Sequence, residues 1–189
     1  MDLELPGLDN MTDDEFFNFC LQNKNTQIER DQNHQIYIMP PAGSESSGLN
    51  LDLATEVNLW NRKSKLGKTR EATAGYYLPD GSMLSPDVSW MSIAKWEAIP
   101  TVERQKFPYT TPEFVIELMS PSDRLKTAKS KMLRWIENGV MLGWLINPKT
   151  ETTFIYRANG SVEIITGFDK KLSGEDVLPG FELDLSILK

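Results

Sequence analysis

Two carboxylates stand out in this sequence because each lies in an apolar, strand-like stretch. Asp87 sits in "SPDVSW", and Glu117 sits in "PEFVIELMSPSD" with apolar residues on both sides. Burying an ionised carboxylate is costly unless an opposite charge or a cation compensates it. If the two strands are neighbours, both side chains reach one point at the end of the sheet, where like charges repel. Mg²⁺ or Mn²⁺ would relieve that repulsion, so Asp87 and Glu117 are predicted metal ligands.

A lysine on the following segment is the third member of this predicted site. The segment 123–139, "DRLKTAKSKMLRWIENG", has a buried stripe at helical spacing and is predicted to be a helix. Lys131 lies on the flank of that stripe, from where its long side chain can reach back toward Glu117. An ammonium beside a metal-bound water can orient the water or neutralise charge on a phosphate.

Each of these residues also has a purely structural interpretation. Asp87 follows Pro86, and Pro-Asp favours turns. Glu117 can be a buried glutamate paired with a nearby arginine such as Arg134, and Lys131 can be an ordinary solvated helix lysine. The sequence pattern by itself leaves these alternatives open.

The elements that must position the three residues follow from local patterns. The predicted order is helix, hairpin, helix, hairpin, strand, helix, strand and hairpin. Thr12 or Asp13 is expected to cap the first helix, and Ser120 and Ser122 are expected to cap the helix that carries Lys131. The predicted segments are a helix at 13–23, a hairpin at 26–41, a flexible loop at 42–48, a helix at 49–67, a hairpin with strands at 76–78 and 88–93, a partly helical excursion at 94–111, strands at 114–119 and 141–148, a hairpin about Asn159-Gly160, and an edge strand at 178–188.

The crossover from the strand at 114–119 through a helix to the strand at 141–148 requires a pair of parallel strands. The predicted fold class is therefore α/β, with a mixed central sheet flanked by helices and with N- and C-terminal hairpins. The 189 residues suit a single domain spanning 1–189, with residues 1–10 as a candidate flexible tail.

The amino-acid composition excludes several classes of catalytic and metal site. The chain has one histidine, His34, and one cysteine, Cys20, which leaves no multi-histidine zinc site and argues against a Ser-His-Asp or Cys-His system. Hydrolysis would therefore have to depend on carboxylates and lysines. One cysteine excludes an internal disulfide framework, and no apolar run approaches the roughly 20 residues of a bilayer-spanning helix. The acidic N-terminus lacks a signal-peptide layout, and we expect a cytoplasmic protein without membrane contact.

The formal net charge of −7 argues against broad, charge-driven coating of nucleic acid, but it leaves room for a local basic groove. Candidate phosphate contacts form a basic run whose alternative interpretation is a solvated helix end. This run comprises Arg62, Lys63, Lys65, Lys68 and Arg70.

Four segments together resemble the Uma-two family, within the PD-(D/E)XK restriction-endonuclease-like superfamily. The segments are "PDVSW" at 86–90, "FVIELMSPSD" at 114–123, "KMLRWIENGVMLGWLINP" at 131–148 and "LPGFEL" at 178–183. The likeness runs from about Met11 to Leu188, in the family's order and spacing. It implies a metal-dependent phosphodiesterase core that contains the superfamily's paired acids.

By this resemblance, Asp87 and Glu117 are the paired acids. The superfamily's lysine, usually two residues after the second acid, is replaced by Met119, and Lys131 on the next helix fits the displaced position. Glu29 in "IER" matches an acidic position of the family, with a salt bridge to Arg30 as its alternative. Asn50 stands where many relatives have histidine.

The predicted function is that of a Mg²⁺- or Mn²⁺-dependent endonuclease that cleaves DNA, with Asp87 and Glu117, and in addition the carbonyl of Leu118, as metal ligands. A homodimer is expected by analogy with enzymes that cut both strands. The residues do not locate sequence-specific base readout; the segments 94–111 and 41–48 are the candidates for it. The alternatives are a catalytically weak or inactive nuclease-fold protein that binds nucleic acid or serves as an oligomeric module, and a carboxylate-based hydrolase of another substrate.

Overall fold

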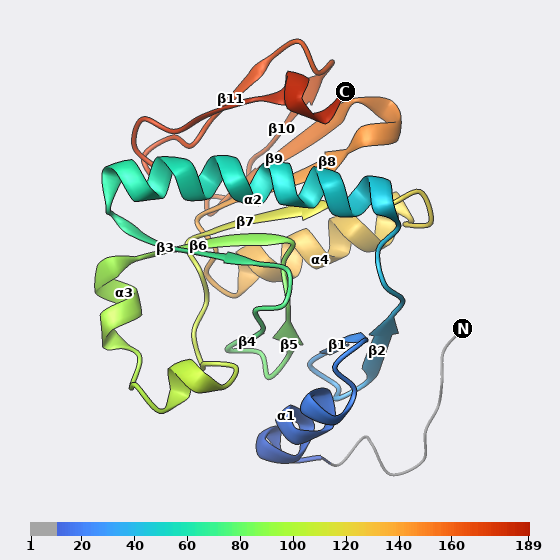
Figure 1. Cartoon of the computed structure of the whole chain (residues 1–189), viewed down its shortest axis with the longest axis vertical. Coiled ribbons are helices and arrows are strands. Elements are labelled where there is room, and N and C mark those ends of the chain that lie inside the picture. Colours follow the sequence, from blue (N-terminus) through green and yellow to red (C-terminus); the bar gives the residue numbers. More distant parts are fainter. Residues whose placement is uncertain (1–10) are drawn as a thin grey trace.

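A computed structural model of the chain describes residues 11–189; the predicted tail at 1–10 lies outside the described residues. A six-stranded mixed sheet forms the centre, with helices on both of its faces (Figure 1). This is the predicted fold class. In spatial order the strands are β10 (Val162–Thr166), β9 (Thr152–Arg157), β8 (Leu142–Asn147), β7 (Phe114–Leu118), β6 (Val88–Ser92) and β3 (Gly67–Glu71).

The pair β7–β8 is parallel and every other pair of this sheet is antiparallel. The helix α4 (Leu125–Glu137) makes the crossover between the two parallel strands, as predicted, and packs on one face of the sheet through Met132 and Trp135. The predicted serine caps are wrong. Arg124 holds the N-cap position without a side-chain bond, and Ser120 instead donates its backbone N–H to Asp123 in the preceding turn.

The long helix α2 (Ser44–Ser64) crosses the opposite face of the sheet (Figure 1). Its predicted apolar stripe is present, with Leu53 and Val57 fully buried. The helix begins at Ser44, however, so the predicted flexible loop at 42–48 is wrong over most of its length. The first turn projects into solvent and carries polar residues, so the apolar periodicity that identifies the helix starts only at Leu49.

A smaller four-stranded sheet lies below the large one in Figure 1. Its strands in spatial order are β2 (Ile36–Met39), β1 (Gln27–Arg30), β5 (Met83–Leu84) and β4 (Tyr76–Tyr77). The predicted hairpin between 76–78 and 88–93 is wrong, because β4 pairs with β5 and β6 pairs with β3 and β7. A tight turn closed by the Leu78 N–H to Ser82 carbonyl bond (2.8 Å) joins β4 directly to β5, so the second strand of this hairpin is 83–84 and not 88–93. The chain then passes from the small sheet to the large one through Ser85–Asp87.

The first helix, α1 (Asp13–Gln22), is capped by Thr12, one of the two predicted caps, in a reciprocal pair with Glu15. Its buried Phe16 packs on Ile28, Tyr77 and Met83 of the small sheet. The hairpin β1–β2 is also as predicted.

The excursion at 94–111 is partly helical, as predicted, with α3 (Ile93–Ala98) and the 3₁₀ turn η1 (Glu103–Gln105). The C-terminal tail does not add an edge strand to the large sheet. Instead β12 (Glu182–Asp184) pairs with β11 (Lys171–Ser173) in a separate ribbon that packs on the α2 side. Two further 3₁₀ turns are η2 (Pro148–Thr150) and η3 (Leu185–Leu188). Among the helices of residues 11–189, none has the length and apolar character that a bilayer crossing requires.

Candidate active site

The register between β6 and β7 brings the two predicted carboxylates together. Val88 is paired with Ile116, and continuing this antiparallel register by one residue places Asp87 opposite Glu117. Glu117 alternates with Val115 along β7, and Val115 belongs to the core cluster beneath α4. Both carboxylates therefore lie at the same end of the sheet on the face that α4 covers.

Lys131 projects from α4 into this end of the sheet. Its Nζ lies 2.8 Å from Oε1 of Glu29 and 2.9 Å from Oε1 of Glu117, and it donates to the carbonyl of Ser85 at 3.0 Å. Lys131 is therefore not a solvated helix lysine. The structure gathers all four residues named from the sequence, Glu29, Asp87, Glu117 and Lys131, at one location.

Glu117 is buried, with 8% of its surface exposed. Besides Lys131, it accepts a hydrogen bond from Nε1 of Trp135 at 2.8 Å. The alternative pairing with Arg134 is not formed, because the ion pair of Glu117 is with Lys131. A full charge and an indole N–H thus compensate the burial of this carboxylate.

Asp87 is held by contacts from both sides of the sheet end. Its Oδ2 accepts the backbone N–H of Leu118 at 2.7 Å, and its Oδ1 accepts Nδ2 of Asn50 at 3.1 Å. The side chain therefore does more than close a turn after Pro86. Oδ1 of Asn50 is buried, and no residue between 11 and 189 hydrogen-bonds to it.

Glu29 reaches the site from the small sheet. It is 6% exposed, and its Oε1 accepts the backbone N–H of Ser85 at 2.9 Å in addition to the contact with Lys131. The alternative pairing with Arg30 is wrong, because neighbouring residues of a strand point to opposite faces and Arg30 pairs with Asp13 on the other side.

A family model and a solved structure are similar to this chain. The model of a family described as "Putative restriction endonuclease", Uma2, matches residues 13–186. The chain belongs to the Uma2 family. It is also similar to a solved structure titled as a putative nuclease belonging to DUF820 from Anabaena variabilis, with a TM-score of 0.75 and 20% identity over 94% of this chain and 97% of that one. At that identity the likeness shows the fold alone. No curated protein matches the chain.

The charges of this Uma2 site do not balance within the protein. Three carboxylates, those of Glu29, Asp87 and Glu117, share the single ammonium of Lys131. Burial raises the pKa of Glu117 to about 8; the charges of Asp87 and Glu29 act in the same direction, and Lys131 opposes them. Burial likewise raises the pKa of Asp87. Burial disfavours the charged form of Lys131, but Glu117 and Glu29 outweigh it and raise the pKa of the ammonium.

The donor set is compatible with a hard divalent cation that keeps part of its hydration. Within the described part of the chain, no group of three or more Asp, Glu, His or Cys side chains is arranged to hold a metal ion. Magnesium, however, is commonly held by only one or two carboxylates together with waters and substrate phosphates. The adjacent carboxylates of Asp87 and Glu117, the surplus negative charge and the buried Oδ1 of Asn50, which can accept a hydrogen bond from a bound water, all fit such an ion.

Two members of the site were not named as such from the sequence. Trp135 lies four residues after Lys131, which places both on one helix face, and this spacing could have identified it. Ser85 takes part through its backbone N–H and carbonyl, so its side-chain type carries no signal. Met119, at the usual lysine position of the superfamily, is buried in the core beneath α4.

Proposed function

We propose that the protein is a Mg²⁺- or Mn²⁺-dependent endonuclease that hydrolyses DNA phosphodiester bonds. The observation that carries the proposal is the pair of facing carboxylates, Asp87 and Glu117, with Nζ of Lys131 at 2.9 Å from Glu117. Membership of a family described as "Putative restriction endonuclease" supports the same reaction class.

Asp87 and Glu117 would hold the cation, with the carbonyl of Leu118 as a further oxygen ligand. The backbone N–H of Leu118 already contacts Asp87, so this peptide borders the site. When bound, such a cation lowers the pKa of a bound water and polarises the phosphate. The protein itself supplies the orientation of the carboxylates, through Asn50 on one side and Trp135 on the other.

Lys131 would orient the attacking water or stabilise charge on the phosphate. Its three N–H groups have four oxygen neighbours, two from Glu117 and one each from Glu29 and Ser85, at 2.8 to 3.1 Å. A water or phosphate oxygen must replace one of these acceptors. Glu29 and Ser85 keep the ammonium in place during that exchange, which makes Glu29 a positioning residue.

The test is nicking of supercoiled plasmid with Mg²⁺ or Mn²⁺, comparing the wild type with Glu117→Gln and Lys131→Met. We expect each substitution to reduce the rate by at least about a hundredfold, because each removes a metal ligand or the charge beside it. Lys126→Met is the matched control, since Lys126 is an exposed lysine of the same helix. Equal cleavage by all four proteins would overturn the site assignment.

A catalytically weak or inactive nuclease-fold protein that binds nucleic acid is the second candidate. The observation in its favour is that protein oxygens already surround the ammonium of Lys131. Wild-type protein that binds DNA but leaves plasmid intact with either metal would support it.

We also propose that the protein acts as a homodimer, because cutting both strands of a duplex commonly uses two copies of one site. Sedimentation equilibrium measures the association directly, and a monomer at assay concentrations would contradict it.

A further inference from the structure

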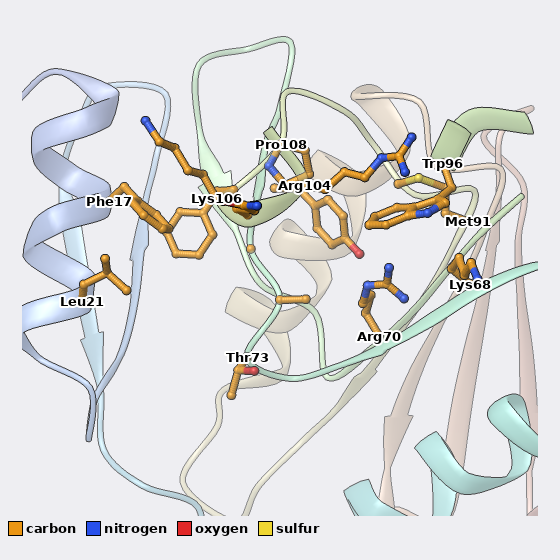
Figure 2. A pocket seen from close by; sticks show the side chains of 15 residues that line it. Phe17, Leu21, Lys68, Arg70, Thr73, Met91, Trp96, Arg104, Lys106 and Pro108 are labelled. Carbon is orange, nitrogen blue, oxygen red and sulfur yellow. The ribbon is translucent and has the colours of Figure 1, made fainter. Parts of the chain in front are cut away.

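A second feature of this molecule carries unbalanced positive charge, in contrast to the net charge of −7. It is a cavity of about 300 Å³ between β3, the second half of α1 and the segment that follows α3 (Figure 2). None of its lining residues is acidic, and four are cationic: Lys68, Arg70, Arg104 and Lys106. We call it the basic cavity.

The basic cavity lies on the same face of the large sheet as the candidate active site. Met91, which lines it, alternates with Ser89 and Asp87 along β6, so the three side chains share one face. The register pairs Arg70 with Ser89 and Lys68 with Met91, which places both cations on that face. Four residues of strand separate Met91 from Asp87, a distance of about 13 Å.

Three of the four cations are free of acidic partners. Lys106 pairs with Asp14 at 2.6 Å on the exposed rim. Between residues 11 and 189, no carboxylate forms an ion pair with Lys68, Arg70 or Arg104. The cavity therefore presents uncompensated positive charge to solvent, which favours an anion.

The two arginines are held in place for binding. Their guanidinium groups lie 4.3 Å (Arg70) and 4.9 Å (Arg104) from the ring centroid of Trp96, and Figure 2 shows them on either side of the indole. Arg104 also donates to the carbonyls of Ile99 at 2.8 Å and Glu97 at 3.1 Å. Such anchoring reduces the conformational entropy lost on binding, and guanidinium groups match phosphate oxygens in geometry.

We propose that the basic cavity binds the phosphodiester backbone of a nucleic-acid strand whose scissile phosphate, further along the same strand, occupies the candidate active site. The proposal rests on the proposed function, because one nucleic-acid strand must serve both sites, which lie about 13 Å apart along β6. Ser89 between them is fully buried, so the nucleic-acid strand would pass over the surface of the protein between the two sites. A polyanionic strand fits uncompensated cations that lie beside an active site for phosphodiesters. The contacts would be to phosphates, so they would orient the strand without reading its sequence.

The test is fluorescence anisotropy of a labelled oligonucleotide in EDTA, so that binding is measured without cleavage. Single-stranded and duplex forms of one sequence are separate arms, since both offer the same phosphodiester chemistry. We expect Arg70→Ala/Arg104→Ala to weaken binding of at least one form about tenfold or more, and to flatten the salt dependence by about one unit per lost phosphate contact.

The matched control is Arg62→Ala/Lys63→Ala, which removes the same charge from exposed positions at the end of α2. It should change affinity by no more than about threefold, the effect of net charge alone. Equal loss in the control and in the cavity variant, or no loss in either, would overturn the proposal. So would the absence of oligonucleotide binding by the wild type.

Because the arginines also pack on Trp96, a second variant protects against misfolding. Lys68→Glu reverses the charge of an exposed lysine on the cavity rim, and Lys63→Glu is its control. Only Lys68→Glu should weaken binding about tenfold. Complete displacement of the oligonucleotide by millimolar orthophosphate would indicate a site for a free anion and would contradict a strand site.

The binding and cleavage results separate the two proposals. If cavity variants lose binding while no protein nicks plasmid, the basic cavity stands and the endonuclease proposal falls. If plasmid is nicked with dependence on Glu117 and the cavity variants bind and cleave like the wild type, the endonuclease stands and the basic cavity falls.

Discussion

At the scale of single residues, the unusual feature is a glutamate within a strand whose every residue is buried. Glu117 is accommodated there because Lys131 supplies a charge and Trp135 an N–H at hydrogen-bonding distance. Lys131 in turn is shared with Glu29, so one ammonium compensates two carboxylates. Removing it leaves both acids buried without a counter-ion.

Lys131→Met should therefore lower the free energy of unfolding by about 3 kcal/mol in metal-free buffer at about pH 9, above the raised pKa of Glu117. Urea denaturation in EDTA measures the loss. Lys126→Met, on the exposed side of α4, should change the free energy of unfolding by less than about 0.5 kcal/mol. Added Mg²⁺ should restore part of the stability of Lys131→Met, because a bound cation replaces the missing charge. Equal stability of the two variants would show that the ammonium does not compensate the carboxylates.

The raised pKa of Glu117 predicts that metal binding releases a proton. Its carboxyl group has a pKa of about 8, so below that pH it is largely protonated, and the proton must leave before the oxygen can coordinate a cation. Affinity for Mn²⁺ should accordingly rise with pH between about 6 and about 8 and level off above. Titration calorimetry in two buffers of different ionisation enthalpy counts the released proton. An affinity that does not change over this range would contradict the assignment of Glu117 as a ligand.

At the scale of elements, the four charged residues of the site come from four different elements, and each element is held by its own packing. The strands β6 and β7 place Asp87 and Glu117, β1 places Glu29, and α4 places Lys131. The first turns of α2 bring Asn50 to Asp87. Shifts of α2 or β3 would therefore disturb the site or the basic cavity without touching a reacting group.

Two glycines in these elements should respond in opposite directions to alanine. Gly48 lies inside α2. Apart from the backbone of the helix itself and the adjoining residues, no described atom lies within 4 Å of the position that an alanine Cβ would take, so Gly48→Ala should raise the free energy of unfolding by about 0.7 kcal/mol. At Gly67, at the start of β3, a Cβ would lie 2.1 Å from the Met91 carbonyl oxygen and 2.5 Å from the Trp90 ring. Gly67→Ala should therefore lower the free energy of unfolding by about 3 kcal/mol. Urea denaturation compares both variants, and a neutral Gly67→Ala would show that β3 can move away from β6.

At the scale of the whole molecule, charge is distributed unevenly. The chain is acidic overall, yet the basic cavity gathers four cations without an acid among its lining residues. The predicted basic run divides accordingly: Lys68 and Arg70 line the cavity, whereas Arg62, Lys63 and Lys65 lie at the end of α2. Net charge therefore does not decide whether a protein of this kind can bind nucleic acid, because the local arrangement does.

Much of the fold could be predicted because the patterns that carry it are local. The stripe of Leu53 and Val57 identified α2, and the apolar run around Glu117 identified β7. The pairing of β4 with β5 could not be predicted in this way. Strands of two residues have no period to detect, so the longer strand at 88–93 was predicted as the partner of 76–78 in place of β5.

Composition and local patterns were enough to limit the chemistry of this protein. With one histidine and one cysteine, the chain has carboxylates and lysines as its reactive groups, and Asp87, Glu117 and Lys131 followed from their apolar surroundings and helical spacing. Only the tertiary structure showed which of these groups contact one another. The contacts of Glu29 with Lys131, of Asn50 with Asp87 and of Arg104 with Trp96 join segments whose approach depends on packing of the whole chain. Spacing along the chain places side chains on one face of an element, but long-range packing places the elements beside one another.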